Sequence, residues 1–188
     1  MTVSPDAGLP QPESKRSKRR QQLWAFQRDI AERTQNARAT VSSGSRRLAI
    51  QAGPEFLLLD LMQTGELLTH TRLTPVPLTK AWFLGLANCR GNLIGVVDLA
   101  GFLGLPVAAP DKNDRLLVLA AMISTHCAIR ISRVIGLIDI ASLSVQPSTA
   151  NAWQFAGRIY TDQESKKWTE LDLAAMARDP SFLDINHS

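Results

Sequence analysis

The sequence predicts a mainly β fold made of small closed barrels. Short apolar runs recur at close spacing from Leu48 onward, and clusters of Gly, Pro, Asn and Asp separate them, a pattern typical of many short strands joined by turns. The segments between these runs leave room only for helices of one or two turns. Because helices long enough to cover a parallel sheet are missing from this part of the pattern, the sequence excludes a doubly wound α/β fold.

Size and composition are those of one soluble globular domain. The 188 residues are 45% apolar and 20% charged, which allows a core of ordinary size. The net charge of +4 is unevenly distributed, since residues 1–47 carry ten Lys or Arg against four Asp or Glu and the remainder is slightly acidic. Cys89 and Cys127 lie in apolar runs, without the repeated spacing of a disulfide framework or a metal site.

The residues before the strand pattern divide into three parts. Residues 1–14 are rich in Pro and polar residues and are expected to be a disordered tail. Residues 15–40 contain neither Gly nor Pro and repeat apolar residues at helical spacing, which predicts an amphipathic helix. Residues 41–46 are expected to be a linker. Because Lys15–Arg20 is strongly basic, a small β-barrel that binds nucleic acid through this arm stays open as an alternative.

The first strands follow directly after this linker. Residues 48–50 form a short strand, and residues 51–55 form a turn. Residues 56–61 are apolar on both faces, which indicates a buried strand. Residues 62–68 fit a single helical turn that runs into a strand, and two prolines predict an extended loop over 69–79.

A central hairpin is the most informative element. Leu84–Cys89 and Leu93–Val97 are apolar, and Gly91-Asn92 between them is a pair that tolerates positive φ in a two-residue turn. Arg90 stands at the lip of this turn, where its guanidinium can reach solvent or a partner. A helical turn over 99–103 follows.

The second half of the chain continues the strand pattern. Gly136 lies inside an apolar run, where a glycine marks a bulge or a sharp barrel corner. Residues 142–151 form a polar loop, and the turn at 162–166 separates the strands of a late hairpin. A short helix near 171–177 is the last expected element, followed by a C-terminal tail over 181–188. The strands of this half are expected over 115–122, 127–132, 134–140, 155–161 and 167–171.

Several of these pieces resemble, in the same order, the CheW family of scaffold proteins in bacterial chemosensory arrays. The stretch Gly85–Leu99 resembles the family's Asn-Leu-Arg-Gly…Pro-Val-x-Asp-Leu signature. Glu66-Leu67-Leu68 is similar to its Val-x-Glu-Ile segment, and Trp168–Leu173 is similar to its closing strand and helix start. The resemblance covers residues 47–178, so a CheW-like domain is expected over 47–180.

The resemblance implies a fold of two intertwined five-stranded, SH3-like β-barrels with short helices. It also implies a non-enzymatic adaptor with two partners, the regulatory domain of a CheA-type histidine kinase and the cytoplasmic tip of a methyl-accepting chemotaxis receptor. The extra N-terminal helix and the aromatic C-terminal pattern are most similar to CheW-type adaptors of type IV pilus and twitching-motility systems. Carried over by position, the implied partner-binding residues are Glu66, Asn88, Arg90, Gly91 and Asp98.

Two interpretations of Arg90 stay open. Glu66 and Arg90 can contact the receptor from either side of a groove, since exposed rim arginines are common in interfaces. Alternatively, Arg90 only caps the hairpin through local carbonyl or carboxylate bonds. The chain also departs from the family pattern: Gly95 stands at the usual proline position, and the usual Gly, apolar residue and Asp are replaced by Ala128, Arg130 and Ser132.

Nothing in the sequence indicates catalysis or a cofactor. His70, His126 and His187 are not spaced with other metal-ligating residues. Asp98 directly follows a strand and precedes a helical turn, which favours an N-cap over a catalytic acid. A hydrolase that uses His126 and Cys127 is a third alternative.

The expected location is cytoplasmic, without membrane insertion. The basic run is followed at once by a charged break and not by the apolar region of a secretory signal, and no apolar run reaches the length of a membrane span. The basic run also lacks interleaved aromatic residues, so the expected partners are proteins and not nucleic acid.

Overall fold

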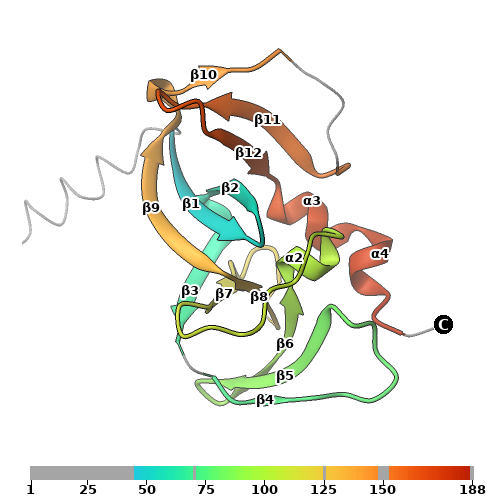
Figure 1. The fold of residues 1–188 in the computed structure, drawn as a ribbon. Helices are drawn as coiled ribbons and strands as arrows, with labels where there is room; N and C mark the ends of the chain where they lie inside the picture. Colours follow the sequence, from blue (N-terminus) through green and yellow to red (C-terminus); the bar gives the residue numbers. More distant parts are fainter. Residues whose placement is uncertain (1–44, 70, 125, 148–152, 187–188) are drawn as a thin grey trace, which may run out of the picture. The chain divides into compact units, whose positions relative to one another are not determined.

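The strand pattern is arranged as two six-stranded sheets (Figure 1). The computed structural model describes residues 45–69, 71–124, 126–147 and 153–186. The predicted tail over 1–14, the predicted helix over 15–40 and all but the end of the predicted linker lie outside these residues. No helix in the described part of the chain is both long and apolar enough to cross a membrane.

The first sheet combines strands from both ends of the described chain. Its strands are β1 (Arg46–Ala52), β2 (Glu55–Asp60), β9 (Arg133–Asp139), β10 (Ser144–Val145), β11 (Ala156–Thr161) and β12 (Lys167–Leu171). Their order in the sheet is β10-β11-β12-β2-β1-β9. All neighbours are antiparallel except β12 and β2, which run in parallel. The chain therefore begins this sheet, leaves it, and returns to complete it.

The second sheet is formed by the intervening part of the chain. Its strands are β3 (Thr64–Leu68), β4 (Leu73–Thr74), β5 (Phe83–Cys89), β6 (Asn92–Asp98), β7 (Arg115–Leu119) and β8 (Cys127–Ile131). Their order is β3-β7-β8-β6-β5-β4, and β6 and β8 are the one parallel pair among them. In Figure 1 β4 and β5 lie at the bottom, whereas β10, β11 and β12 lie at the top.

The two end strands of each sheet are consecutive in the chain. The 3-10 helix η2 (Ile140–Ser142) joins β9 to β10, and residues 69–72 join β3 to β4. The end strands β10 and β4 have two residues each, so each sheet has five longer strands. The predicted mainly β fold with two strand assemblies is confirmed.

Alternating side chains on the strands divide the core into three clusters. Leu57 and Leu59 of β2 belong to a large cluster that takes residues from both sheets, whereas Leu58 points into the first sheet's own interior. On β6, Val97 belongs to the shared cluster and Val96 to the interior of the second sheet. Because both faces of such strands are buried, their sequences read as continuous apolar runs.

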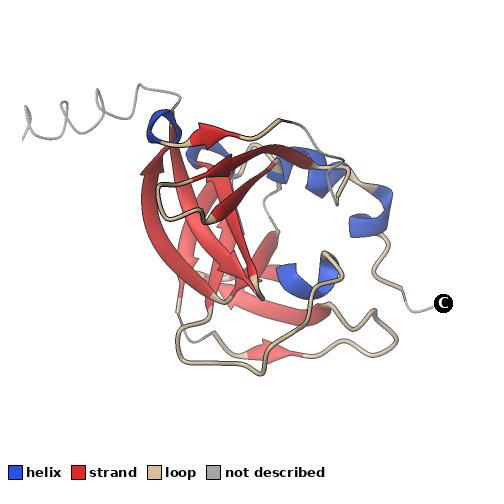
Figure 2. Ribbon diagram, turned by 45° about the horizontal axis from the view of Figure 1, so that its top comes forward, coloured by secondary structure: helices blue, strands red, loops and turns tan. Residues whose placement is uncertain are grey.

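The helices are short and begin at aspartates. They are α2 (Leu99–Phe102), α3 (Leu173–Arg178), α4 (Pro180–Leu183) and two 3-10 helices, η1 (Leu61–Gln63) and the η2 helix given above. Asp98, Asp172 and Asp179 accept backbone hydrogen bonds at the starts of α2, α3 and α4, as N-cap residues do. These three α-helices lie on one side of the sheets (Figures 1 and 2).

The predicted tail over 181–188 is wrong for residues 181–186. Pro180 starts α4 and does not merely end α3, since proline fits the first turn of a helix. Phe182 is buried against Trp82 and Phe102. The Lys80 N–H donates to the Ile185 carbonyl at 2.8 Å, so this segment is fixed to the loop before β5.

Three further expectations can be compared with the strands. The bulge expected at Gly136 is present, because the β1–β9 register shifts by one residue there and Gly136 has φ +148°. The strand expected over 115–122 ends at Leu119, and residues 121–123 form a turn. The loop expected over 142–151 contains the two-residue strand β10.

Candidate docking surface

The tip of the β5–β6 hairpin is a two-residue turn at Arg90-Gly91. Cys89 pairs with Asn92, and both turn residues have positive φ, 50° and 87°, as primed hairpin turns require. The Asn88 side-chain oxygen accepts a hydrogen bond from the Gly91 N–H at 2.9 Å. The predicted turn at Gly91-Asn92 is therefore wrong by one residue, because this bond places the positive-φ pair one position earlier.

Arg90 reaches from this tip to β3, at the other end of the sheet order. Its Nη2 lies 2.5 Å from Oε1 of Glu66. The two residues are therefore in direct contact and do not face each other across an open groove. The Arg90 side chain is 77% exposed and the Glu66 side chain 36%, so solvent screens the pair and it contributes under about 1 kcal/mol to folding.

The surface around this pair offers both charge and apolar contact. Leu93 is exposed and lies opposite Asn88 in the hairpin. A guanidinium has five N–H groups, and most of those on Arg90 stay available beside the Glu66 bond. We call Glu66, Asn88, Arg90, Gly91 and Leu93 the hairpin-tip surface. Leu93 was missed by sequence reasoning, because an apolar residue in a strand gives no sign of which face is covered.

Asp98 does not belong to this surface. It is 3% exposed and lies at the far end of β6. One carboxylate oxygen accepts the Gly101 N–H at 3.3 Å, and the other accepts Nη2 of Arg130 at 2.5 Å. Asp98 is therefore the N-cap of α2, as its position predicts, and its implied contact with a partner does not fit its burial.

Two departures from the family pattern have local explanations. The Gly95 N–H donates to the His126 carbonyl at 2.8 Å, a bond that proline cannot make. Arg130 lies directly opposite Asp98 in the parallel β6–β8 pair, and its charge offsets that of the buried carboxylate.

A second group of exposed apolar side chains flanks the shared core. Leu137 on β9 lies opposite Leu48, and Leu67 on β3 lies opposite Leu117. Leu48 and Leu117 are both buried in the shared cluster, whereas Leu137 is 57% exposed and Leu67 41%. The shared core therefore continues to the surface on each of the two sheets. We call Leu67 and Leu137 the core margin.

Cys127 and His126 give no support to the alternative that the chain is a hydrolase. Burial raises the pKa of the Cys127 thiol to about 11, so the thiol is protonated at neutral pH and is a poor nucleophile. The Cys127 Sγ lies 3.9 Å from the Ala128 carbonyl oxygen. Among the described residues, no group of three or more His, Cys, Asp or Glu could hold a metal ion.

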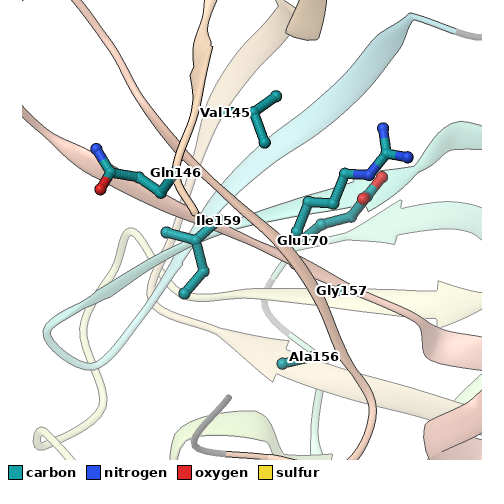
Figure 3. Close-up of a pocket in the computed structure, with 7 residues that line it drawn as sticks. Val145, Gln146, Ala156, Gly157, Ile159 and Glu170 are labelled. Atoms are coloured by element: carbon teal, nitrogen blue, oxygen red, sulfur yellow. The ribbon is translucent and has the colours of Figure 1, made fainter. Parts of the chain in front are cut away.

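A hollow of about 480 Å³ lies beside the irregular pairing of β11 with β12. Figure 3 shows Gln146 at one end of this hollow and Glu170 at the other, with Val145 and Ile159 between them. Glu170 accepts a hydrogen bond from Nε of Arg47 at 2.8 Å. The lining residues described include neither His nor Cys.

Comparison with known proteins gives one consistent family. A family model described as CheW-like domain matches residues 47–181. Protein PilI of Pseudomonas aeruginosa is 28% identical over 142 residues, which are 73% of this chain and 78% of that protein. Chemotaxis protein CheW of Rhizobium meliloti is 26% identical over 121 residues, or 64% of this chain and 77% of that protein.

A solved structure has the same fold. The crystal structure of the scaffolding protein TtCheW from Thermoanaerobacter tengcongensis matches with a TM-score of 0.61. The match covers 73% of this chain and 95% of that one, at 20% sequence identity. At this identity the likeness concerns the fold, and it includes both sheets.

Proposed function

Since the chain belongs to the CheW-like domain family, we propose that it is a non-enzymatic chemosensory adaptor. In this function it couples the cytoplasmic tip of a methyl-accepting receptor to the regulatory domain of a CheA-type histidine kinase. The similarity to Protein PilI supports a place in a system that controls type IV pili. The observation that carries the proposal is the family match, which extends over both sheets and the shared core between them.

The core margin supports docking of a helical partner. Leu67 and Leu137 expose apolar area next to a core that is otherwise closed. Exposed apolar side chains that adjoin a core mark interaction sites when they gather on one surface. An amphipathic helix covers exposed apolar side chains with the residues of its own apolar face. A receptor tip made of helices would present such a face.

The hairpin-tip surface supports a separate polar contact. Arg90 is exposed, keeps unused N–H groups, and is held in place by the turn and by Glu66. A preorganised arginine loses less conformational entropy on binding than a freely moving one. Glu66 and Arg90 therefore act together in the proposal, with Arg90 as the residue that reaches the receptor.

The test is a pulldown with purified partners and the full-length chain. The unmodified protein should retain both the kinase regulatory domain and the receptor tip. Arg90→Glu should lose the receptor at least tenfold in affinity while it keeps the kinase domain and its melting temperature. Arg46→Glu, which changes an exposed arginine on β1, is the matched control and should leave both partners bound.

Two results would count against the proposal. If Arg90→Glu binds both partners normally, Arg90 has no part in docking. If the unmodified chain binds neither partner but binds DNA or RNA with a steep salt dependence that deletion of residues 1–20 removes, the chain acts as a nucleic-acid-binding protein.

A further inference from the structure

The second barrel has a small open cavity at one end of its interior. The cavity measures about 170 Å³ and lies between the segment around Leu68 and Leu73 and the segment 110–116. Its apolar part consists of Leu68, Leu73 and Leu116, which belong to or pack against the interior of the second sheet. Barrel mouths of this kind are common places for small ligands.

Two arginines line the polar part of the cavity. Arg130 donates to Asp98 through Nη2, and its Nη1 lies 3.9 Å from Asp114, beyond hydrogen-bond distance. Arg115 donates through Nη1 to the carbonyls of Lys112 and Asp114 at 2.9 and 2.8 Å. Each guanidinium has five N–H groups, and no buried side-chain N or O atom is left unpaired in the described residues. The remaining N–H groups therefore face solvent and the cavity.

Two carboxylates stand beside these arginines. Asp114 uses one oxygen to accept the Asp111 N–H at 3.1 Å. Asp111 accepts a hydrogen bond from Asn113 at 2.9 Å, and this bond lowers the pKa of Asp111. Both residues line the cavity. Asp111 also accepts hydrogen bonds from the backbone N–H groups of Lys112 and Asn113, whereas Asp114 has one carboxylate oxygen for which no protein donor is described. The cavity thus combines cationic donors, anionic acceptors and an apolar floor.

We propose that this cavity binds the zwitterion of a small apolar α-amino acid. The carboxylate of the ligand would bind Arg130 and Arg115, the ammonium group would bind Asp111 and Asp114, and the side chain would lie on the three leucines. A simple anion would be repelled by the two aspartates, and a simple cation by the two arginines. A ligand that carries both charges avoids both penalties.

Size and sequence both restrict the proposal. Pockets for drug-sized ligands measure roughly 300–1,000 Å³, so a cavity of about 170 Å³ fits a molecule of few heavy atoms. Arg130 stands where the resembling family usually has an apolar residue. Use of the cavity would make the protein responsive to a metabolite in addition to its proposed partners.

The test is a ligand series on the unmodified full-length protein. Its leucine methyl groups are observed by NMR while L-leucine is added up to about 10 mM, a concentration that reveals even millimolar affinity. The methyl signals of Leu68, Leu73 and Leu116 should shift. 4-Methylvalerate, which lacks the ammonium group, and isopentylamine, which lacks the carboxylate, should bind at least tenfold more weakly.

A variant pair identifies the site. Arg115→Leu should weaken L-leucine binding at least tenfold, and Arg158→Leu, on the other sheet, should leave it unchanged. The inference is overturned if L-leucine produces no shift at these methyls, or if either one-charge analogue binds as tightly as L-leucine. It is also overturned if Arg115→Leu, folded by circular dichroism, binds L-leucine normally.

Discussion

Arg130 and Asp98 join β8, β6 and α2 through a single buried ion pair. The two residues lie opposite each other in the one parallel pair of the second sheet, and Asp98 also caps α2. Their side chains are 14% and 4% exposed. Removal of Asp98 would leave only Asp114, 3.9 Å from Nη1 of Arg130, to offset the largely buried charge of Arg130, and such a loss costs more than the intact pair contributes.

Asp98→Ala should therefore lower the free energy of unfolding by about 3–5 kcal/mol. Asp98→Asn keeps a cap acceptor and should be less destabilising. Urea denaturation followed by circular dichroism measures both. Asp139→Ala removes the exposed cap of η2 and should cost only about 1 kcal/mol, so an Asp98→Ala effect as small as that of Asp139→Ala would contradict the buried-pair interpretation.

Gly95→Pro should destabilise this chain, although proline is the usual family residue there. The substitution removes the N–H that bonds to the His126 carbonyl, and the loss of one backbone hydrogen bond between β6 and β8 costs about 0.5–1.5 kcal/mol. Gly95→Ala keeps the N–H. Its Cβ would lie 3.2 Å from the Phe83 ring, which a small ring movement can relieve. Thermal unfolding should place the proline variant below both the parent chain and the alanine variant; a proline variant as stable as the parent would show that this bond is unimportant.

Phe182→Ala should destabilise the fold, because α4 closes the aromatic cluster around Trp82. Phe182 is 6% exposed, and truncation of a buried phenylalanine costs about 3–5 kcal/mol. The neighbouring Leu183 is exposed, so Leu183→Ala is the matched control and should change stability by under about 0.5 kcal/mol. Equal effects of the two substitutions in denaturant unfolding would show that this segment is only loosely attached.

The Cys127 thiol should react slowly with alkylating reagents near neutral pH. With a pKa of about 11, about one thiol in a thousand is ionised at pH 8. Iodoacetamide labelling followed by mass spectrometry should accelerate only as the pH approaches 11. Rapid labelling of the folded protein at pH 7 would show an activated thiol and would revive the hydrolase alternative.

The same pKa makes stability depend on pH. The folded state raises the Cys127 pKa above its ordinary value of 9.0, so the protonated thiol is favoured in the folded protein. This contribution is complete below pH 9 and is lost as the pH rises through about 11. Cys127→Ala should remove that part of the alkaline decline in melting temperature; an unchanged profile would assign the decline to other groups.

Much of the fold follows from local sequence patterns. The runs that form β2, β6 and β8 are apolar at consecutive positions because they contribute to two clusters at once. Gly136 marks the bulge of β9, and Asp98 marks the start of α2. These features depend on a few neighbouring residues, so the sequence alone predicts them.

The features that the sequence did not predict correctly depend on contacts between residues far apart in the chain. The pairing of Arg130 with Asp98 joins positions 32 residues apart. Phe182 packs against Trp82, which comes from a distant part of the chain. Exposure of Leu67, Leu93 and Leu137 depends on where the two sheets stop covering each other. The Arg90-Gly91 turn was misplaced because Asn92 is an equally good turn residue, and the Asn88 hydrogen bond decides between the two registers.

The proposed adaptor function requires one copy of this chain to bind a receptor and a kinase domain at the same time. Sedimentation velocity of the full-length protein with a receptor-tip fragment and a CheA-type regulatory domain tests it most directly. We predict a ternary complex that contains both partners and that Arg90→Glu reduces to the binary complex with the kinase domain. Mutually exclusive binding of the two partners, or binding of neither, would contradict the account.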